Sequence, residues 1–152
     1  MAEYQYAVER YVDFKVEAEG LLKEHYEEVA EDKDLIQLNA DHARYEAYDD
    51  AGTLHLVTCR CDGKLIGYYL CFVYTHPHYK DSLTAYTDVF FISKEYRKGR
   101  VGIKLFQYVE QTLRQRGVQR IYAGTKLKLD IGPMLEYLGY NPIERVYTKV
   151  LK

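Results

Sequence analysis

Proline and glycine are scarce in this sequence, with 3 and 10 residues among 152. Neither is abundant enough to indicate a disordered or fibrous chain, and the sequence contains no low-complexity segment and no internal repeat. The hydrophobic fraction of 47% and the charged fraction of 29% are typical of a globular protein. Because a chain of this length usually builds one core, the sequence predicts a single domain over residues 1–152.

Long apolar runs are also missing. The longest, Leu65 to Tyr74, is about half the roughly 20 residues that a membrane-spanning helix needs. The first residues, Met1 to Tyr6, lack the basic stretch and apolar stretch of a secretory signal. The sequence therefore predicts a cytoplasmic protein with no membrane partner.

Cysteine occurs three times, as Cys59, Cys61 and Cys71, each in a segment with a strand pattern. An odd number of cysteines argues against a disulfide framework, and no Cys/His cluster has the spacing of metal ligands. We therefore expect buried free thiols and no metal site. Cys59 and Cys61, two residues apart, should lie on the same face of the sheet.

Charge is nearly balanced overall, at a net −2, but it is uneven along the chain. Residues 1–50 contain 15 acidic and 5 basic side chains, whereas residues 94–128 contain 10 basic and 2 acidic ones. One end of the domain could favour an anion and the other a cation, or both could be solvated faces. The low net charge makes nucleic acid an unlikely partner.

The apolar periodicity alternates between strand and helix patterns. Helical spacing of three and four residues puts His25 on the apolar face of the first helix, as a packed core residue rather than a ligand. Asp62-Gly63 predicts a tight hairpin between two antiparallel strands. The predicted strands are Tyr4–Ala7, Leu54–Cys61, Leu65–Thr75, Thr84–Ile92, Val118–Gly124 and Arg145–Leu151, and the predicted helices begin near Glu9, Asp41, Val101 and Asp130.

This order predicts an α/β (α+β) fold, with a mixed, mostly antiparallel central sheet of six to seven strands and helices on both faces. Val118–Gly124 follows a helix and should be parallel to the strand before that helix. Gly52, Gly117 and Gly139 stand where helices should end.

The turn between Thr84–Ile92 and the long helix is suited to phosphate. The first amides of a helix have no intrahelical acceptor, and the helix dipole adds positive potential there. Glycines allow the backbone to approach a ligand closely, and arginine can hold phosphate through two hydrogen bonds. Neither the Walker spacing nor the dinucleotide-binding spacing is present, which argues against an NTPase and a Rossmann oxidoreductase. The turn reads Arg97-Lys98-Gly99-Arg100-Val101-Gly102.

With this turn in place, the chain resembles the GNAT superfamily of acyl-CoA-dependent N-acyltransferases, and it looks closest to short members found in phages and bacteria. The family signature is Gln/Arg-x-x-Gly-x-Gly/Ala at the start of the helix after the fourth strand. Arg97 and Gly102 match its first and last positions, while Arg100 replaces the middle glycine. Tyr137-Leu-Gly-Tyr140 and the segment after it resemble the family's Leu-Gly-Phe element and closing strand.

The resemblance implies a GNAT fold and acetyl-CoA as cosubstrate, with no metal. In the family, the fourth strand splays from the fifth and its exposed backbone pairs with the pantetheine arm. By position, this role falls to the main chain of Phe91, Ile92 and Ser93. The pyrophosphate would then lie at the turn from Arg97 to Gly102.

The catalytic groups are only partly represented. Asp88 occupies the place where some family members carry a catalytic glutamate, and it could act as a base, order water or play a structural role. The family's usual acid is a tyrosine on the last short helix, and this chain has Leu135 there. Tyr137 lies about 200 degrees further around that helix, so the general acid is unassigned.

The acceptor side carries His76 and His78 in a loop, either as surface residues or as acceptor-site residues. Four acidic residues of the first helix suggest a cationic acceptor, although they could also be an ordinary solvated face: Glu24, Glu27, Glu28 and Glu31.

The sequence thus predicts an N-acetyltransferase that acts on a primary amine, either a small cationic amine or a protein lysine or N-terminus, by direct attack. The alternative is a catalytically weak GNAT-fold module that binds CoA and a protein partner. The assembly could be a monomer or a homodimer.

Overall fold

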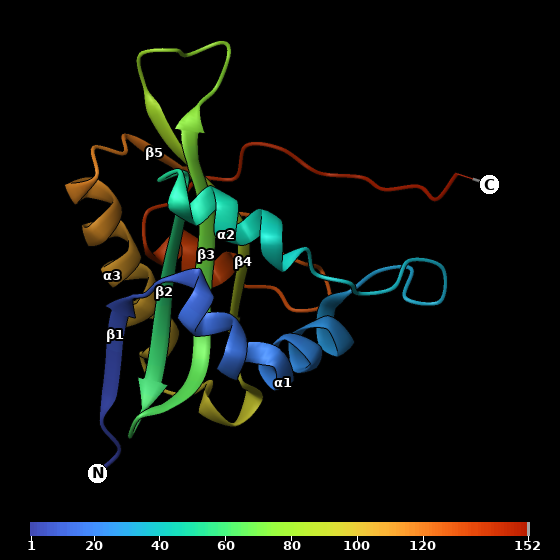
Figure 1. The fold of residues 1–152 in the computed structure, drawn as a ribbon, viewed down its shortest axis with the longest axis vertical. Helices are drawn as coiled ribbons and strands as arrows, with labels where there is room; N and C mark the ends of the chain where they lie inside the picture. The colour runs from blue at the N-terminus through green and yellow to red at the C-terminus, as the bar shows by residue number, and fades with distance from the viewer. Residues whose placement is uncertain (152) are drawn as a thin grey trace.

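The protein, described by a computed structural model over residues 1–151, forms a single five-stranded sheet with helices on both faces (Figure 1). Lys152, the last residue of the predicted domain, lies outside the described residues. The strands follow the order of the sequence across the sheet: β1 (Tyr4–Val8), β2 (Leu54–Cys61), β3 (Lys64–Thr75), β4 (Leu83–Ile92) and β5 (Arg120–Tyr122).

The first four strands are antiparallel neighbours, and β5 is parallel to β4. The predicted hairpin between β2 and β3 is confirmed. Asp62 and Gly63 both have positive φ, at 49° and 85°, as the tight turns that match strand twist require.

The helices are α1 (Tyr11–Val29), α2 (His42–Asp50), α3 (Val101–Gln115) and α4 (Gly132–Tyr137), with a short 3₁₀ turn at Lys94–Tyr96. The Asp41 carboxylate caps α2 by accepting a hydrogen bond from the Arg44 amide at 3.0 Å. Gly117, with φ of 86°, follows the end of α3. The helix boundaries at both places were therefore predictable from local sequence.

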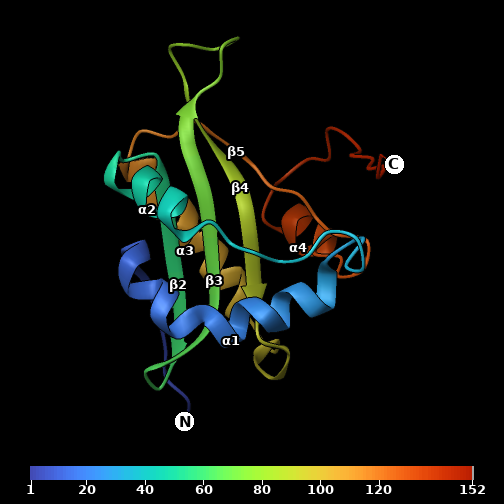
Figure 2. The same ribbon diagram turned by 45° about the vertical axis from the view of Figure 1, so that its right-hand side comes forward.

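Two apolar cores hold the three layers together. One lies between the sheet and α3 and includes Leu105, Phe106 and Val109. The other lies under α1, where Tyr11 and Phe14 are buried. Figure 2 shows α1 and α2 in front of the sheet and α3 behind it. The fully buried Cys59 and Cys71 share the first core with Cys61, so the expectation of buried free thiols on one face is confirmed.

The sheet is smaller than predicted, with five strands instead of six to seven. The predicted strand Arg145–Leu151 is wrong: this segment has no strand partner and extends away from the sheet (Figure 1). Its alternating apolar residues, such as Val146 at 88% exposure, form a strand pattern, but a strand needs a neighbour to satisfy its backbone. The predicted Val118–Gly124 is shortened to β5, because the chain leaves β4 after Tyr122.

None of the helices among residues 1–151 combines the length and the apolarity needed to cross a bilayer.

Candidate active site

The C-terminal half of β4 has an open edge. β5 pairs with β4 only from Thr84 to Tyr86, and the rest of that edge has no strand partner within residues 1–151. The Ser93 amide donates to the Ile66 carbonyl of β3 at 2.8 Å. The Ile92 carbonyl of the same peptide therefore points the other way, toward the open edge. This part of the β4 edge, facing the chain after β5, has no strand partner among the described residues, but its Ile92 carbonyl already accepts a hydrogen bond from Arg97 Nε at 2.6 Å.

A β-bulge in β4 sets the direction of Asp88. Leu70 pairs with Val89 and Cys71 pairs with Thr87, so Asp88 is the extra residue of β4. The Thr87 hydroxyl meets Tyr69 at 2.8 Å on the α3 side of the sheet, whereas Val89 packs in the core under α1. The bulge breaks the alternation between Asp88 and Val89, so that both side chains face the α1 and α2 side of the sheet.

Asp88 is held there by α2. The Tyr45 hydroxyl donates to Asp88 Oδ2 at 2.6 Å. The side chain keeps contact with solvent, but the surrounding protein removes enough water to raise the pKa of the carboxyl group, and the Tyr45 hydrogen bond opposes that rise. A raised pKa improves a carboxylate as a proton acceptor near neutral pH.

Asp88 opens into a cavity of about 550 Å³. The cavity lies between α1, the segment before α2, β3, β4 and the segment that follows β5. Aromatic and aliphatic side chains dominate its walls, and Lys126 and His25 contribute an amino group and an imidazole ring. Its size and concave, mainly apolar lining are those of a small-molecule site.

His25 both packs and lines this cavity. Its ring stacks on Phe91 with 4.5 Å between centroids, and Nδ1 lies 2.7 Å from the Tyr68 hydroxyl. Burial lowers the pKa of His25 to about 4, so the ring is neutral at pH 7. The sequence prediction of a packed histidine is confirmed, and its position on the cavity wall was not predicted.

The turn that follows β4 leaves the start of α3 free to bind an anion. The first intrahelical hydrogen bond runs from the Lys104 amide to the Arg100 carbonyl at 2.8 Å, and no side chain among residues 1–151 caps the helix. The amides of the first turn, from Val101 onward, therefore have no intrahelical acceptor. Gly99, with φ of 61°, provides the bend, and Lys98 and Arg100 are exposed beside it. These groups fit a phosphate-bearing cosubstrate.

Arg97 is engaged elsewhere. Its guanidinium forms two 2.6 Å contacts with the Glu28 carboxylate, and its Nε donates to the Ile92 carbonyl at 2.6 Å. The guanidinium also lies 4.9 Å from the Phe91 ring centroid. Its charge is therefore neutralised by α1, and its direct contact with pyrophosphate stays a prediction.

Gly102 faces the protein interior. A Cβ atom there would lie 3.2 Å from the Met134 sulfur and 3.5 Å from Ile92 Cδ1. The absence of a side chain thus lets α4 pack against α3, in addition to any approach by a ligand.

The other candidate side chains do not meet in the cavity. Leu135 is buried in the core and offers no proton, whereas Tyr137 is 64% exposed and its hydroxyl lies 3.3 Å from an Arg100 nitrogen. His76 and His78 lie in the β3–β4 loop that projects from the top of Figure 1 and do not line the cavity.

The four acidic side chains predicted to face a cationic acceptor already have partners, and the last of them, Glu31, lies just after the end of α1. Glu24 accepts from the Ser93 hydroxyl at 3.0 Å, and Glu28 binds Arg97. Glu27 lies 3.5 Å from Lys33, and Glu31 lies 3.3 Å from Lys128. The sequence could not reveal these ion pairs, because most of the partners are about 70 to 100 residues away. No group of three His, Cys, Asp or Glu side chains within residues 1–151 could hold a metal ion.

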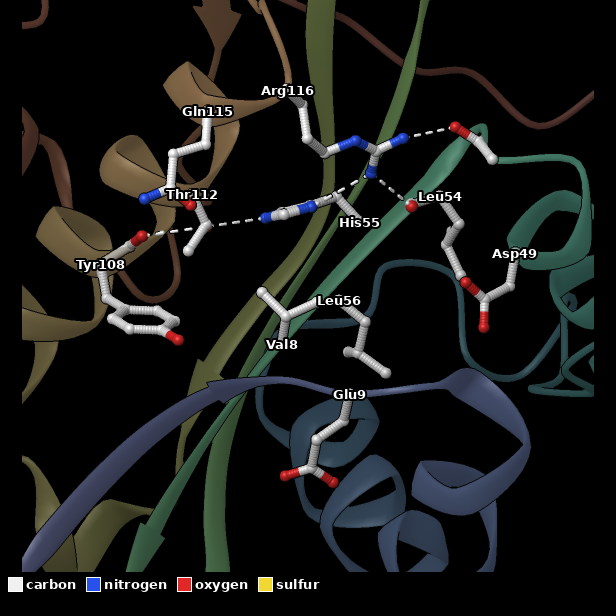
Figure 3. Close-up of a pocket in the computed structure, with 11 residues that line it drawn as sticks. Val8, Glu9, Asp49, Leu54, His55, Leu56, Tyr108, Thr112, Gln115 and Arg116 are labelled. Carbon is white, nitrogen blue, oxygen red and sulfur yellow. Dashed lines mark hydrogen bonds between the residues drawn. The ribbon is translucent and has the colours of Figure 1, made fainter.

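A second cavity, of about 430 Å³, lies between β1, β2 and α3 (Figure 3). His55 meets the Thr112 hydroxyl at 2.8 Å, and Arg116 donates to the Leu54 carbonyl at 2.8 Å and to His55 Nδ1 at 3.1 Å. Asp49 accepts from Arg10 at 2.9 Å. Since these polar groups are hydrogen-bonded within the protein, this cavity has the character of a structural cluster rather than a reactive site.

A sequence profile of the Acetyltransferase (GNAT) family matches residues 17–131. No curated protein sequence matches the chain. Among solved structures, an aminoglycoside acetyltransferase from an uncultured soil metagenomic sample is similar at 12% identity and a TM-score of 0.75, with 99% of each chain covered.

Two further structures have 12% identity and cover 99% of this chain. The ribosomal-protein-alanine N-acetyltransferase from Brucella melitensis biovar Abortus 2308 has a TM-score of 0.71, with 100% of its own chain covered. The predicted acetyltransferase with acetyl-CoA from Clostridium acetobutylicum has a TM-score of 0.70, with 96% of its own chain covered. At this identity the three structures show that the fold is shared.

Proposed function

Because this chain belongs to the GNAT family and is an acyl-CoA-dependent N-acyltransferase, we propose that it moves an acetyl group from acetyl-CoA to a primary amine by direct attack. The proposal is carried by the arrangement of three neighbouring features on and after β4. The open edge of β4 leads into the uncapped start of α3, and Asp88 faces a cavity on the same strand.

In this proposal the main chain of Phe91, Ile92 and Ser93 binds the pantetheine arm along the open edge of β4. The amides from Arg97 to Gly102 bind the pyrophosphate, and Lys98 and Arg100 add positive charge. Arg97 also fixes this turn against α1 through Glu28. Acetyl-CoA supplies a thioester carbonyl that an amine can attack.

Asp88 is the proposed proton acceptor. An alkyl amine with a pKa near 10.4 requires about 4.6 kcal/mol to lose a proton at pH 7. Asp88 takes this proton directly or through water, and the nitrogen lone pair that is freed attacks the thioester carbonyl, so that the N–C bond forms and the C–S bond breaks. The nitrogen then loses a second proton, which balances the proton taken up by the CoA thiolate, and no residue is assigned to that step because Leu135 replaces the usual tyrosine.

Direct attack is supported by the state of the thiols. Burial raises the pKa of Cys59 to about 11 and that of Cys71 to about 12. Since the thiolate is the nucleophile in cysteine catalysis, neither group is suited to forming an acyl-enzyme at neutral pH.

The first test is Asp88→Asn, which keeps the size of the side chain and removes its basicity. We expect kcat to fall by about 10²-fold while acetyl-CoA affinity is unchanged. Thiol release measures kcat, and calorimetry measures affinity. Asp81→Asn, the same change at an exposed acid before β4, is the matched control and should keep full activity.

Full turnover by Asp88→Asn would show that Asp88 is not the base.

The buried Leu135 favours one alternative, a GNAT-fold module that binds CoA and a protein partner without turnover. Acetyl-CoA binding without thiol release in the presence of a broad amine panel would support that alternative.

A further inference from the structure

The charge inventory of the main cavity is small. Of the residues that line it in the described chain, Asp88 alone carries a carboxylate, and Lys126 carries the opposite charge. His25 is neutral at pH 7 because burial lowers its pKa to about 4. None of the acidic residues of α1 lines the cavity, and the carboxylates nearest its C-terminal end, Glu24, Glu27, Glu28 and the following Glu31, lie against Ser93, Lys33, Arg97 and Lys128. The cavity therefore offers one site for one ammonium group.

The walls of the cavity are apolar and largely aromatic. Tyrosine hydroxyls on the walls are already bonded: Tyr11 to His42 at 2.8 Å, Tyr26 to the Ile36 carbonyl at 3.1 Å, and Tyr68 to His25. Tyr11 and Tyr68 are also almost fully buried, so the tyrosine rings that a ligand can reach on these walls are the partly exposed ones of Tyr26 and Tyr45. The remaining wall residues on this side are apolar: Phe14, Leu22, Val29, Leu38, Ala40 and Leu70.

Exposed apolar residues adjoin one wall of the cavity. The connection between α1 and α2 exposes Leu35 at 66%, Ile36 at 62% and Leu38 at 48%, and Leu38 also lines the cavity. Such a group of exposed apolar residues beside a cavity is typical of a binding surface for an apolar ligand.

We propose that the acceptor is a small primary amine with a single positive charge on an apolar or aromatic body, and not a polycation such as a polyamine or an aminoglycoside. This inference rests on the proposed acetyl transfer and names its acceptor. The amino group lies at Asp88, where the reacting proton leaves, and the body lies against Tyr26 of α1, Tyr45 of α2 and the aliphatic side chains beside them. A second ammonium group would lose hydration without a carboxylate to replace it and would be repelled by Lys126.

The experiment compares kcat/KM for 2-phenylethylamine, ethanolamine and spermidine, with kanamycin and a lysine-containing peptide as further acceptors. Ethanolamine has the same single charge without the apolar body, and spermidine has the extra charge. We expect 2-phenylethylamine to exceed each of the others by at least about tenfold, the difference that a few buried methylene groups make.

A paired substitution tests the reason for the preference. Leu38→Glu adds a carboxylate to the cavity wall at a half-exposed position, and it should raise kcat/KM for spermidine and lower it for 2-phenylethylamine. Leu127→Glu makes the same change at a residue that is 98% exposed and outside the cavity lining, and it should leave both values unchanged.

Faster acetylation of spermidine, kanamycin or the peptide than of 2-phenylethylamine would overturn this inference and leave acetyl transfer intact. No acetylation of any amine by a protein that binds acetyl-CoA would instead reject the proposed function. In that case the inference is tested by the change in the melting temperature of the CoA complex when 2-phenylethylamine is added. A rise with 2-phenylethylamine in wild type but not in Asp88→Asn would support it, and no rise in wild type would overturn it.

Discussion

Asp88 carries a carboxylate in a strand whose neighbours are aromatic and aliphatic, and its chemistry depends on two contacts of different kinds. The bulge between Thr87 and Val89 puts Asp88 and Val89 on the same face of the sheet, and the Tyr45 hydroxyl of α2 donates to Asp88 at 2.6 Å. Partial loss of hydration raises the pKa of Asp88, and the hydrogen bond from Tyr45 lowers it. The protein thus keeps the carboxylate basic and oriented at once.

Tyr45→Phe tests this balance. Removing the hydroxyl removes the effect that lowers the pKa of Asp88, so the acidic limb of the kcat/KM profile should move to higher pH. The ionised carboxylate is the active form, and activity is therefore lost at a higher pH as the solution is acidified. Tyr11 and Tyr68 also face Asp88 from α1 and β3 and keep their hydroxyls in this variant.

The measurement is the pH dependence of kcat/KM with a saturating concentration of acetyl-CoA. Tyr48→Phe, the same change one turn later on α2, is the control and should keep the wild-type profile. An unshifted acidic limb in Tyr45→Phe would separate Asp88 from the proton transfer.

Asp88 could be singled out from the sequence as a candidate base because an acidic residue inside an otherwise apolar strand is unusual. Its direction could not, since a bulge depends on the register between β3 and β4, which is set by pairing over the whole hairpin. Tyr45 was invisible for the same reason, being 43 residues away in the chain. The roles of the predicted site residues stay predictions until they are tested.

At the scale of elements, the turn from β4 to α3 joins two anion-binding features. The uncapped amides of α3 supply a fixed dipole, and the exposed side chains of Lys98 and Arg100 supply mobile charge. Local sequence was sufficient to predict this turn, because a glycine with positive φ and an abrupt helix start leave clear signals. The Arg97–Glu28 pair was not predictable, because it depends on how α1 crosses the sheet.

Lys98→Glu tests the contribution of side-chain charge at this turn. Reversing an exposed charge beside the proposed pyrophosphate site should raise the Kd of acetyl-CoA by about tenfold, equivalent to about 1.4 kcal/mol. The effect should shrink as salt is added, because exposed charges are screened. Isothermal titration calorimetry at low and high salt gives both values.

Arg114→Glu reverses a charge in the last turn of the same helix and is the matched control. It should leave the Kd of acetyl-CoA unchanged. Equal effects of the two substitutions would mean that net charge, and not the turn, governs binding.

At the scale of the molecule, two cores support the site from opposite faces of one sheet, and the last segment of the chain contributes little to either. The order of the predicted helices and of the first five strands was right because most have an apolar period, and α2, which has almost none and buries no residue, is marked by its Asp41 cap and by Gly52 after its end. The prediction of a sixth strand was wrong because alternating apolar and polar residues show only that a segment can pair as a strand, and not that a partner strand is present. The cytoplasmic location and a homodimeric assembly stay predictions.

Deleting residues 143–152 tests how much the last segment stabilises the protein. Ile143, Val146, Tyr147 and Leu151 are each at least 68% exposed, so their loss should lower the free energy of unfolding by less than about 1 kcal/mol. Leu113→Ala, at a fully buried residue of α3, should cost about 2–5 kcal/mol in the same urea titration. A comparable loss in the truncated protein, with a smaller mass by light scattering, would show that the segment packs against a second copy.

The most direct measurement follows a labelled acetyl group. Wild-type protein and Asp88→Asn are incubated with isotopically labelled acetyl-CoA and 2-phenylethylamine, and the amine is analysed by mass spectrometry as CoA is released. We predict labelled N-acetyl-2-phenylethylamine in a one-to-one ratio with CoA for wild type and a large loss of both for Asp88→Asn. CoA release without labelled amide, or equal labelling by the two proteins, would contradict acetyl transfer to an amine at Asp88.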